Sequence, residues 1–124
     1  MTLIHHTDTR RTETPSGVMT TLASPTQGDT GQALWHVRIH PGIAGPVHTI
    51  DAEQIWTVLT GQLTIALDDT TIAAAEGDTV VLRANATRQV VAGDDGFTAI
   101  VTGPAGSRAR TPGSDEAVVP PWIA

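Results

Sequence analysis

Residues 41–67 read PGIAGPVHTIDAEQIWTVLTGQLTIAL, and this stretch decides the fold of the chain. A Pro-Gly pair and a Gly-Pro pair punctuate its start, as turns between strands do. A run of apolar and β-branched residues follows, typical of buried strands, and it is interrupted at Gly61. Because glycine adopts positive φ readily, the interruption predicts a tight hairpin between strands at Gln54–Leu59 and Gln62–Leu67.

The rest of the chain repeats this pattern of short strands separated by turn residues. Ala33–His40 is a clear period-two strand, in which apolar and polar residues from Trp35 onward lie on opposite faces. The apolar face carries Trp35, Val37 and Ile39. The polar face carries His36, Arg38 and His40. Further strands are predicted at Gly17–Ala23, Thr71–Ala74, Thr79–Leu82, Thr87–Ala92 and Phe97–Thr102. With no amphipathic helix longer than a turn or two, the pattern predicts an all-β barrel or sandwich.

Composition excludes several classes of function. The chain has no cysteine, so disulfides, thiolate nucleophiles and cysteine-ligated zinc are excluded. It has no lysine, which excludes a lysine Schiff base. A net charge of −6 argues against a nucleic-acid surface. The N-terminus lacks the pattern of a secretion signal, and no apolar run is long enough to span a membrane. We therefore expect a soluble, cytoplasmic protein.

The length of 124 residues predicts a single domain over the whole chain. Three parts are expected: an N-terminal arm at 1–16, a barrel at 17–103 and an extended C-terminal tail at 104–124. Within the arm, Leu3-Ile4 is the candidate edge strand. Within the tail, Trp122 and Ile123 follow two prolines and are too apolar to be left in water. We expect them to dock on the barrel or on a second subunit.

The spacing of residues 42–61 resembles the first motif of the cupin family, Gly-x5-His-x-His-x3-Glu-x6-Gly. Gly42 and His48 fit the first two positions, and Gly61 closes the motif. Ile50 replaces the second histidine and Gln54 replaces the glutamate. The resemblance implies a cupin double-stranded β-helix, or jelly-roll barrel, extending over residues 33–102.

The second cupin motif, Gly-x5-Pro-x-Gly-x2-His, falls on Gly77 and then on Arg83, Asn85 and Arg88. Its spacing is kept, but its proline, glycine and histidine are all replaced. In metal-binding cupins three histidines and a glutamate hold a divalent ion. Here Arg88 stands at the last histidine position, and a guanidinium repels a cation. We therefore predict no metal and no other cofactor, unless His36 or His40 turns inward to complete a site.

The resemblance places Arg88, Gln54, Trp56 and His48 inside the barrel. A buried arginine needs a partner, and an anionic ligand such as a carboxylate or enolate would supply one. The alternative is that Arg88 reaches the barrel mouth and pairs with an acidic residue, Asp51 or Glu53. His48 is the candidate catalytic residue, as a proton shuttle, or is simply a packed histidine. Gln54, Trp56 and Arg88 are the candidate substrate-binding residues, although a lone tryptophan there is more often core packing.

These residues favour a metal-independent cupin that binds a small anionic organic molecule. The family analogy suggests an isomerase, cyclase, dehydratase or lyase of bacterial secondary metabolism. Two alternatives stay open: a non-catalytic sensor or carrier, and a metal-dependent dioxygenase-like cupin. Both faces of Gln54–Leu59 are largely apolar, so each must be covered. Because small cupins commonly dimerise through such a surface, we expect a homodimer.

Overall fold

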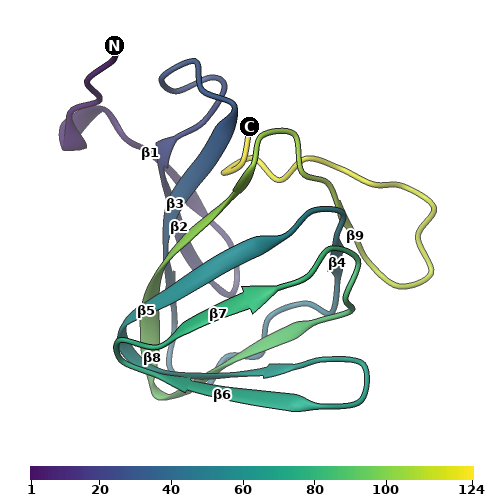
Figure 1. Ribbon diagram of the computed structural model, residues 1–124. Helices are drawn as coiled ribbons and strands as arrows, with labels where there is room; N and C mark the ends of the chain where they lie inside the picture. Colours follow the sequence, from purple (N-terminus) through teal and green to yellow (C-terminus); the bar gives the residue numbers. More distant parts are fainter.

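The computed structural model describes residues 1–124, and nearly all of its regular structure is β-strand (Figure 1). One helical turn, η1, spans His6–Asp8. The strands are β1 (Arg10–Glu13), β2 (Gly17–Ala23), β3 (Gln32–Ile39), β4 (Thr49–Ile50), β5 (Gln54–Ala66), β6 (Thr71–Ala75), β7 (Thr79–Leu82), β8 (Gln89–Pro104) and β9 (Ala109–Arg110). The predicted all-β fold is confirmed. None of the helical segments has the length and hydrophobicity that a membrane-spanning helix needs.

The strands form one large antiparallel sheet, in the order β1-β2-β3-β8-β5-β6 with β7 beside β5, and a small sheet of β4 and β9. β5 and β8 are the longest strands, at 13 and 16 residues. They pair along two stretches, on either side of a bend. The first half of β5 also pairs with β7, and its second half pairs with β6. These two strands therefore hold both sides of the barrel together.

The predicted hairpin at Gly61 is wrong, because Gln54–Ala66 is one continuous strand. The strands predicted at Thr87–Ala92 and Phe97–Thr102 are likewise two parts of the single strand β8. Other strand boundaries agree closely with the prediction. The hairpin from β5 to β6 is closed by a hydrogen bond from Leu67 N to Thr70 O of 2.8 Å.

Both errors arise from glycines that bend a strand without ending it. Gly61 has φ +76° and lies between two shifts in the register of β5 against β8. Gly96, on β8, has φ +72°. A Cβ on Gly61 would collide with the carbonyl oxygen of Gly96. The two strands therefore turn the corner of the barrel at one point, where only glycine backbone fits.

The inner face of the sheet carries the core in rows that cross the strands. Trp35 on β3 pairs with Val101 on β8, which pairs with Trp56 on β5. Because directly paired residues share a face, both tryptophans project into the barrel. The alternation predicted for β3 is confirmed, since Trp35 and Val37 are only 3% and 2% exposed.

The C-terminal segment returns across the barrel and packs on it (Figure 1). Ala109 pairs with Ile50 of β4 and forms a bridge with Val118. Farther on, Thr21 Oγ1 on β2 donates to the carbonyl oxygen of Trp122 at 2.8 Å. Ile123 is 1% exposed and belongs to the hydrophobic core. The expected docking of this tail is therefore onto the chain's own barrel.

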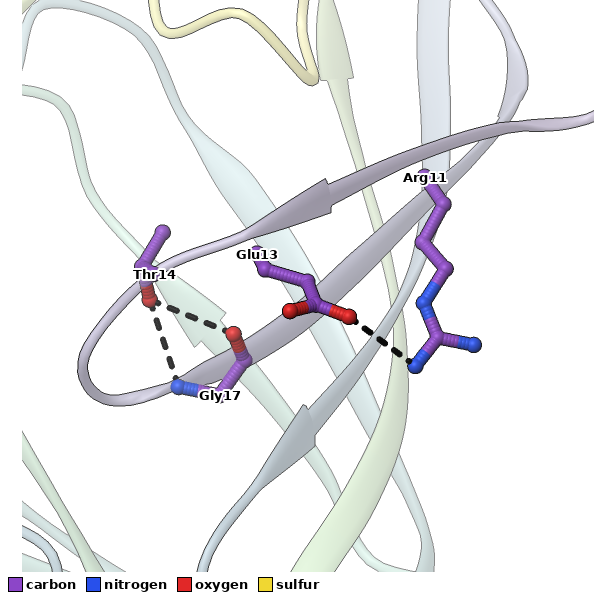
Figure 2. A network of polar contacts seen from close by, with 4 residues as sticks. All are labelled: Arg11, Glu13, Thr14 and Gly17. Atoms are coloured by element: carbon purple, nitrogen blue, oxygen red, sulfur yellow. Dashed lines mark hydrogen bonds and ion pairs between the residues drawn. The ribbon is translucent and has the colours of Figure 1, made fainter.

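At the other end of the chain, the edge strand is β1 and not the predicted Leu3-Ile4. Figure 2 shows the turn from β1 to β2, where Gly17 N donates to Thr14 Oγ1 at 3.2 Å. The nearby ion pair between Arg11 and Glu13, at 3.4 Å, is well exposed and contributes little to stability. The turn matters because it forms part of the wall of a cavity.

The outer face of β5 is apolar as predicted. Ile55 and Leu59 are 39% and 40% exposed, and Val81 of the neighbouring β7 is 51% exposed. A homodimer that would cover these side chains stays a prediction.

We predict that Gly61→Ala destabilises the protein more than Gly77→Ala does. Both glycines have positive φ, at +76° and +86°, so each alanine incurs about 1–2 kcal/mol of backbone strain. Only at Gly61 would the new methyl group also strike neighbouring backbone, which adds about 1–3 kcal/mol. Urea unfolding of both variants measures the difference. Equal losses of stability would contradict the corner role of Gly61.

Candidate functional site

The barrel forms a partly open cavity of about 620 Å³ between β3, β5, the His48 segment, the β1–β2 turn and the C-terminal tail. Twelve of the 22 residues that line it are hydrophobic. None of the 22 is an aspartate, glutamate, lysine or arginine, and His48 is the one histidine. The cavity is therefore an apolar chamber with a single titratable side chain on its wall.

His48 is positioned by the backbone of the strand beside it. Its N–H donates to Arg88 O and its carbonyl oxygen accepts from Arg88 N, both at 2.9 Å. In the ring, Nδ1 lies 2.9 Å from Pro46 O. Because a carbonyl oxygen only accepts, Nδ1 carries the proton, and Nε2 is left with a free lone pair.

Burial lowers the pKa of His48 below its ordinary value of 6.5. The hydrogen bond to Pro46 raises this pKa, and the Arg88 charge lowers it again. Burial dominates because the charged imidazolium loses solvation inside the barrel. At neutral pH the side chain is therefore an uncharged base.

Gln54 is 3% exposed and lies at the start of β5. Its Oε1 accepts from Trp56 Nε1 at 3.1 Å and from Arg88 Nη1 at 3.4 Å. Two donors on the same atom fix the orientation of the amide. Its Nε2 makes no hydrogen bond within the protein. Ser24 Oγ is the one buried side-chain polar atom that lacks a hydrogen-bond partner, so Gln54 Nε2 is not fully buried. The NH₂ group of Gln54 therefore opens to the cavity.

Arg88 is 1% exposed, which makes it the largest fully buried side chain. Its Nε donates to Ala86 O at 3.2 Å and its Nη2 to Arg83 O at 3.0 Å, while Nη1 donates to Gln54. Burial lowers the pKa of Arg88 from an ordinary value of 12.5, but an arginine in a protein keeps its proton. The positive charge is held by oxygen dipoles alone.

The alternative pairing of Arg88 with an acidic residue does not occur. The one ion pair in the protein joins Arg11 to Glu13, and Asp51 Oδ1 instead accepts from Arg108 N at 2.7 Å. Arg88 is not among the residues that line the cavity, but it donates to Gln54, which does line it. Its role as a substrate-binding residue stays a prediction, and any influence on a ligand passes through Gln54.

Trp56 lines the cavity and directs its ring nitrogen at Gln54. Its ring centroid lies 6.4 Å from that of Phe97, with the planes tilted by 47°. His36 and His40 do not line the cavity. The structure thus brings His48, Gln54 and Trp56 together at one cavity and places Arg88 one side chain behind.

Sequence reasoning missed two parts of the wall. The turn at 14–16 and the tail from Ala109 to Ile123 both contribute lining residues, Trp122 among them. A signal was present for the tail, since Trp122 and Ile123 are too apolar to be left in water and were expected to dock on the barrel or on a second subunit. For the turn there was none, because Thr14, Pro15 and Ser16 read as ordinary turn residues.

The donor atoms of this cavity do not fit a divalent metal ion. No group of three or more histidine, aspartate, glutamate or cysteine side chains is close enough to hold one. His48 Nε2 is a single free donor, Gln54 Oε1 is already occupied by two N–H groups, and Ile50 presents only carbon. Catalytic metal sites use about three protein ligands.

Comparison with known proteins gives a family and a fold. The sequence profile of the family described as Cupin domain matches residues 35–102, more than half of the chain. Oxalate decarboxylase from Bacillus subtilis, solved at pH 4.6, superposes with a TM-score of 0.73 and 15% identity. Two single-residue variants of that enzyme give the same values. No curated protein matches this sequence.

The superposition covers 81% of this chain but only 28% of the decarboxylase chain. At this identity the likeness shows the fold alone, and it confirms the predicted jelly-roll barrel. Another structure of the same enzyme is described by its Mn(II) centres. This chain does not offer the donor set that such a centre requires.

We predict that Gln54→Leu and Gln54→Glu have opposite effects on stability. Leucine removes the acceptor of two buried N–H groups, one of them charged, at a cost of about 1–3 kcal/mol or more. Glutamate keeps an acceptor oxygen and places a carboxylate against the Arg88 guanidinium, 3.4 Å from the present Oε1. Urea unfolding at pH 7 compares the two variants. The account of Arg88 would be wrong if both variants lost the same stability.

A second prediction concerns the protonation of His48. Ring NMR should give a midpoint below 6.5, with the Nδ1–H tautomer at neutral pH. Because the folded pKa is lowered, the unfolded chain binds the proton more tightly, and stability is lost as pH falls below 6.5. His36, whose pKa is lowered by burial and by Arg38, contributes in the same direction.

The variants His48→Gln and His36→Gln separate the two contributions. In each variant the free energy of unfolding should fall less steeply as the pH is lowered. A midpoint for His48 above 6.5 would contradict the effect of burial on its pKa, and a midpoint above neutral pH would show a charged imidazole and remove the free base.

Proposed function

The chain belongs to the cupin family, and from this premise we propose that it is a metal-independent cupin that transforms a small organic molecule by proton transfer. The molecule becomes negatively charged when it loses a proton during the reaction, as an enolate or phenolate. The observation that supports this proposal is the single uncharged base, His48, on the wall of a 620 Å³ chamber that has no other titratable side chain.

His48 acts as the general base. Its Nε2 lone pair removes a proton from a carbon beside a carbonyl group, or from a hydroxyl group, and becomes Nε2–H. The hydrogen bond from Nδ1 to Pro46 O, at 2.9 Å, keeps the proton on Nδ1 and the ring in place while Nε2 gains and returns the other proton. The same Nε2–H then returns the proton to a different atom of the ligand.

Gln54 stabilises the oxygen that becomes negative. Its free NH₂ group donates to that oxygen, while its Oε1 accepts from Arg88 and Trp56. Donors on one end of an amide polarise it and strengthen the hydrogen bond that the other end gives. The buried guanidinium thereby supports the developing oxyanion from behind, in a site that is already organised before the ligand arrives.

This arrangement serves a limited set of reactions. Returning the proton to a new position gives an isomerisation. Attack of the enolate carbon on a second carbonyl group of the same molecule, with the resulting alkoxide protonated by His48, gives a cyclisation. Departure of a hydroxyl group as water, with the proton returned by His48, gives a dehydration. Each balances with the groups present and requires no oxidant, reductant or metal.

A carrier or sensor is the second candidate, because an apolar chamber covered by the chain's own tail also suits simple binding. The two functions differ in one measurable property. A carrier leaves the hydrogens of its ligand in place, whereas the enzyme exchanges them with solvent.

The test is hydrogen exchange into 2-tetralone, a small ketone with acidic C–H groups, in heavy water. We expect the chelator-treated protein to accelerate exchange, followed by NMR. His48→Ala should reduce the acceleration by roughly 100-fold or more, since general-base catalysis is worth that much. Gln54→Glu, which removes the NH₂ donor but keeps the acceptor for Arg88, should also reduce it.

His36→Ala is the matched control, because His36 lies outside the cavity, and it should keep the full rate. Binding of 2-tetralone without exchange would replace the enzyme with the carrier. Exchange that appears only after Mn(II) or Fe(II) is added would favour the metal-dependent alternative. Absence of both binding and exchange would overturn the proposal.

A further inference from the structure

We propose that the ligand is a flat, conjugated molecule with one phenol or enol oxygen, held against tryptophan rings, and uncharged when it enters. The role of that oxygen rests on the function proposed above. The shape of the molecule does not, because it is argued from a different set of residues.

All three tryptophans of the chain line this one cavity. Trp35 and Trp56 lie on the same cross-strand row, separated by Val101, so their backbones are about 10 Å apart. Trp122 comes from the C-terminal tail, where Thr21 Oγ1 holds its carbonyl oxygen at 2.8 Å. Thr21 itself pairs with Trp35. The tail therefore brings Trp122 to the Trp35 end of this cross-strand row.

Trp56 is held by more than packing. Its Nε1 donates to Gln54 Oε1, and its ring rests against Phe97. The ring is thus oriented before any ligand binds, which lowers the entropy cost of using it as a stacking surface. Aromatic rings stack in offset or edge-to-face arrangements, and such contacts favour a flat partner over a puckered one.

Prolines make the remaining apolar wall rigid. Four of them line the cavity: Pro15, Pro46, Pro120 and Pro121. The proline ring fixes the backbone φ at each of these positions, which limits the conformational freedom of the wall segments. A volume of about 620 Å³ lies within the range that protein pockets use for drug-sized molecules, so a fused-ring compound is compatible in size.

Gln54 and His48 define the hydrogen bonds that a ligand can make at this end of the cavity. Gln54 offers N–H donors and the uncharged His48 offers one acceptor. A hydroxyl group on a conjugated ring satisfies either residue. A carboxylate would lack a direct cationic partner, because Arg88 is behind Gln54 and no other cation lines the wall. The combination selects a neutral hydroxy or oxo compound over a carboxylic acid.

Calorimetric titration with three probes tests this inference. They are 2-naphthol, which is flat, decahydro-2-naphthol, which has the same skeleton but is puckered, and 2-naphthoate, which is flat but carries a carboxylate. We expect 2-naphthol to bind at least about tenfold more tightly than either of the others.

Trp122→Leu should reduce the preference for the flat probe severalfold while leaving the saturated alcohol nearly unaffected. Leucine keeps an apolar side chain there, and circular dichroism with urea unfolding checks that the variant is folded. Val81→Ala is the matched control, because Val81 is exposed on the outer face and does not line the cavity. It should leave all three affinities unchanged.

Equal binding of the flat and puckered alcohols, tighter binding of 2-naphthoate, or no binding of 2-naphthol would each overturn the inference. So would an unchanged preference in folded Trp122→Leu. If 2-naphthol binds as expected but 2-tetralone does not exchange, the proposed function fails and the ligand class stands. If exchange occurs without any preference for flat probes, the ligand class fails and the proposed function stands.

Discussion

The buried guanidinium of Arg88 is the constraint on which the site depends. With 1% exposure and no carboxylate nearby, its charge must be satisfied by oxygen dipoles, and Gln54 supplies one of them. That contact orients the amide of Gln54, and the same oxygen orients the ring of Trp56. Backbone hydrogen bonds also join Arg88 to His48. One unpaired charge therefore orients Gln54 and, through the same oxygen, Trp56, beside the strand segment that positions His48.

The chamber depends equally on two distant parts of the chain. The bent strands β5 and β8 turn together at Gly61 and Gly96, which closes the barrel on one side. On the other side the C-terminal tail crosses back, tied through Ala109 to β4 and through Trp122 to β2. Because neither the turn at 14–16 nor the tail has a core of its own, both are ordered by packing on the barrel.

Local sequence predicted some features well and others badly, for identifiable reasons. The alternation in Ala33–His40 predicted which residues face inward, because period-two burial is a local property of a strand. Gly61 was wrongly predicted to form a hairpin turn, because a tight turn and a β-bulge can both require a positive backbone φ. Only the opposing strand distinguishes them, and that strand lies more than thirty residues away.

By itself the sequence determined the all-β fold, the cupin spacing and the absence of cysteine and lysine. These follow from residue type and spacing, which act locally. That His48, Gln54, Trp56 and Arg88 share the inside of one barrel was an expectation drawn from the resemblance to the cupin motifs. Tertiary structure alone decided that Arg88 lies behind Gln54 and that Trp122 closes the same chamber. Both depend on distant segments of the chain, which supply the hydrogen-bond partners of one side chain and bury the apolar surface of the other. The spacing of residues in the sequence does not say which segments do so.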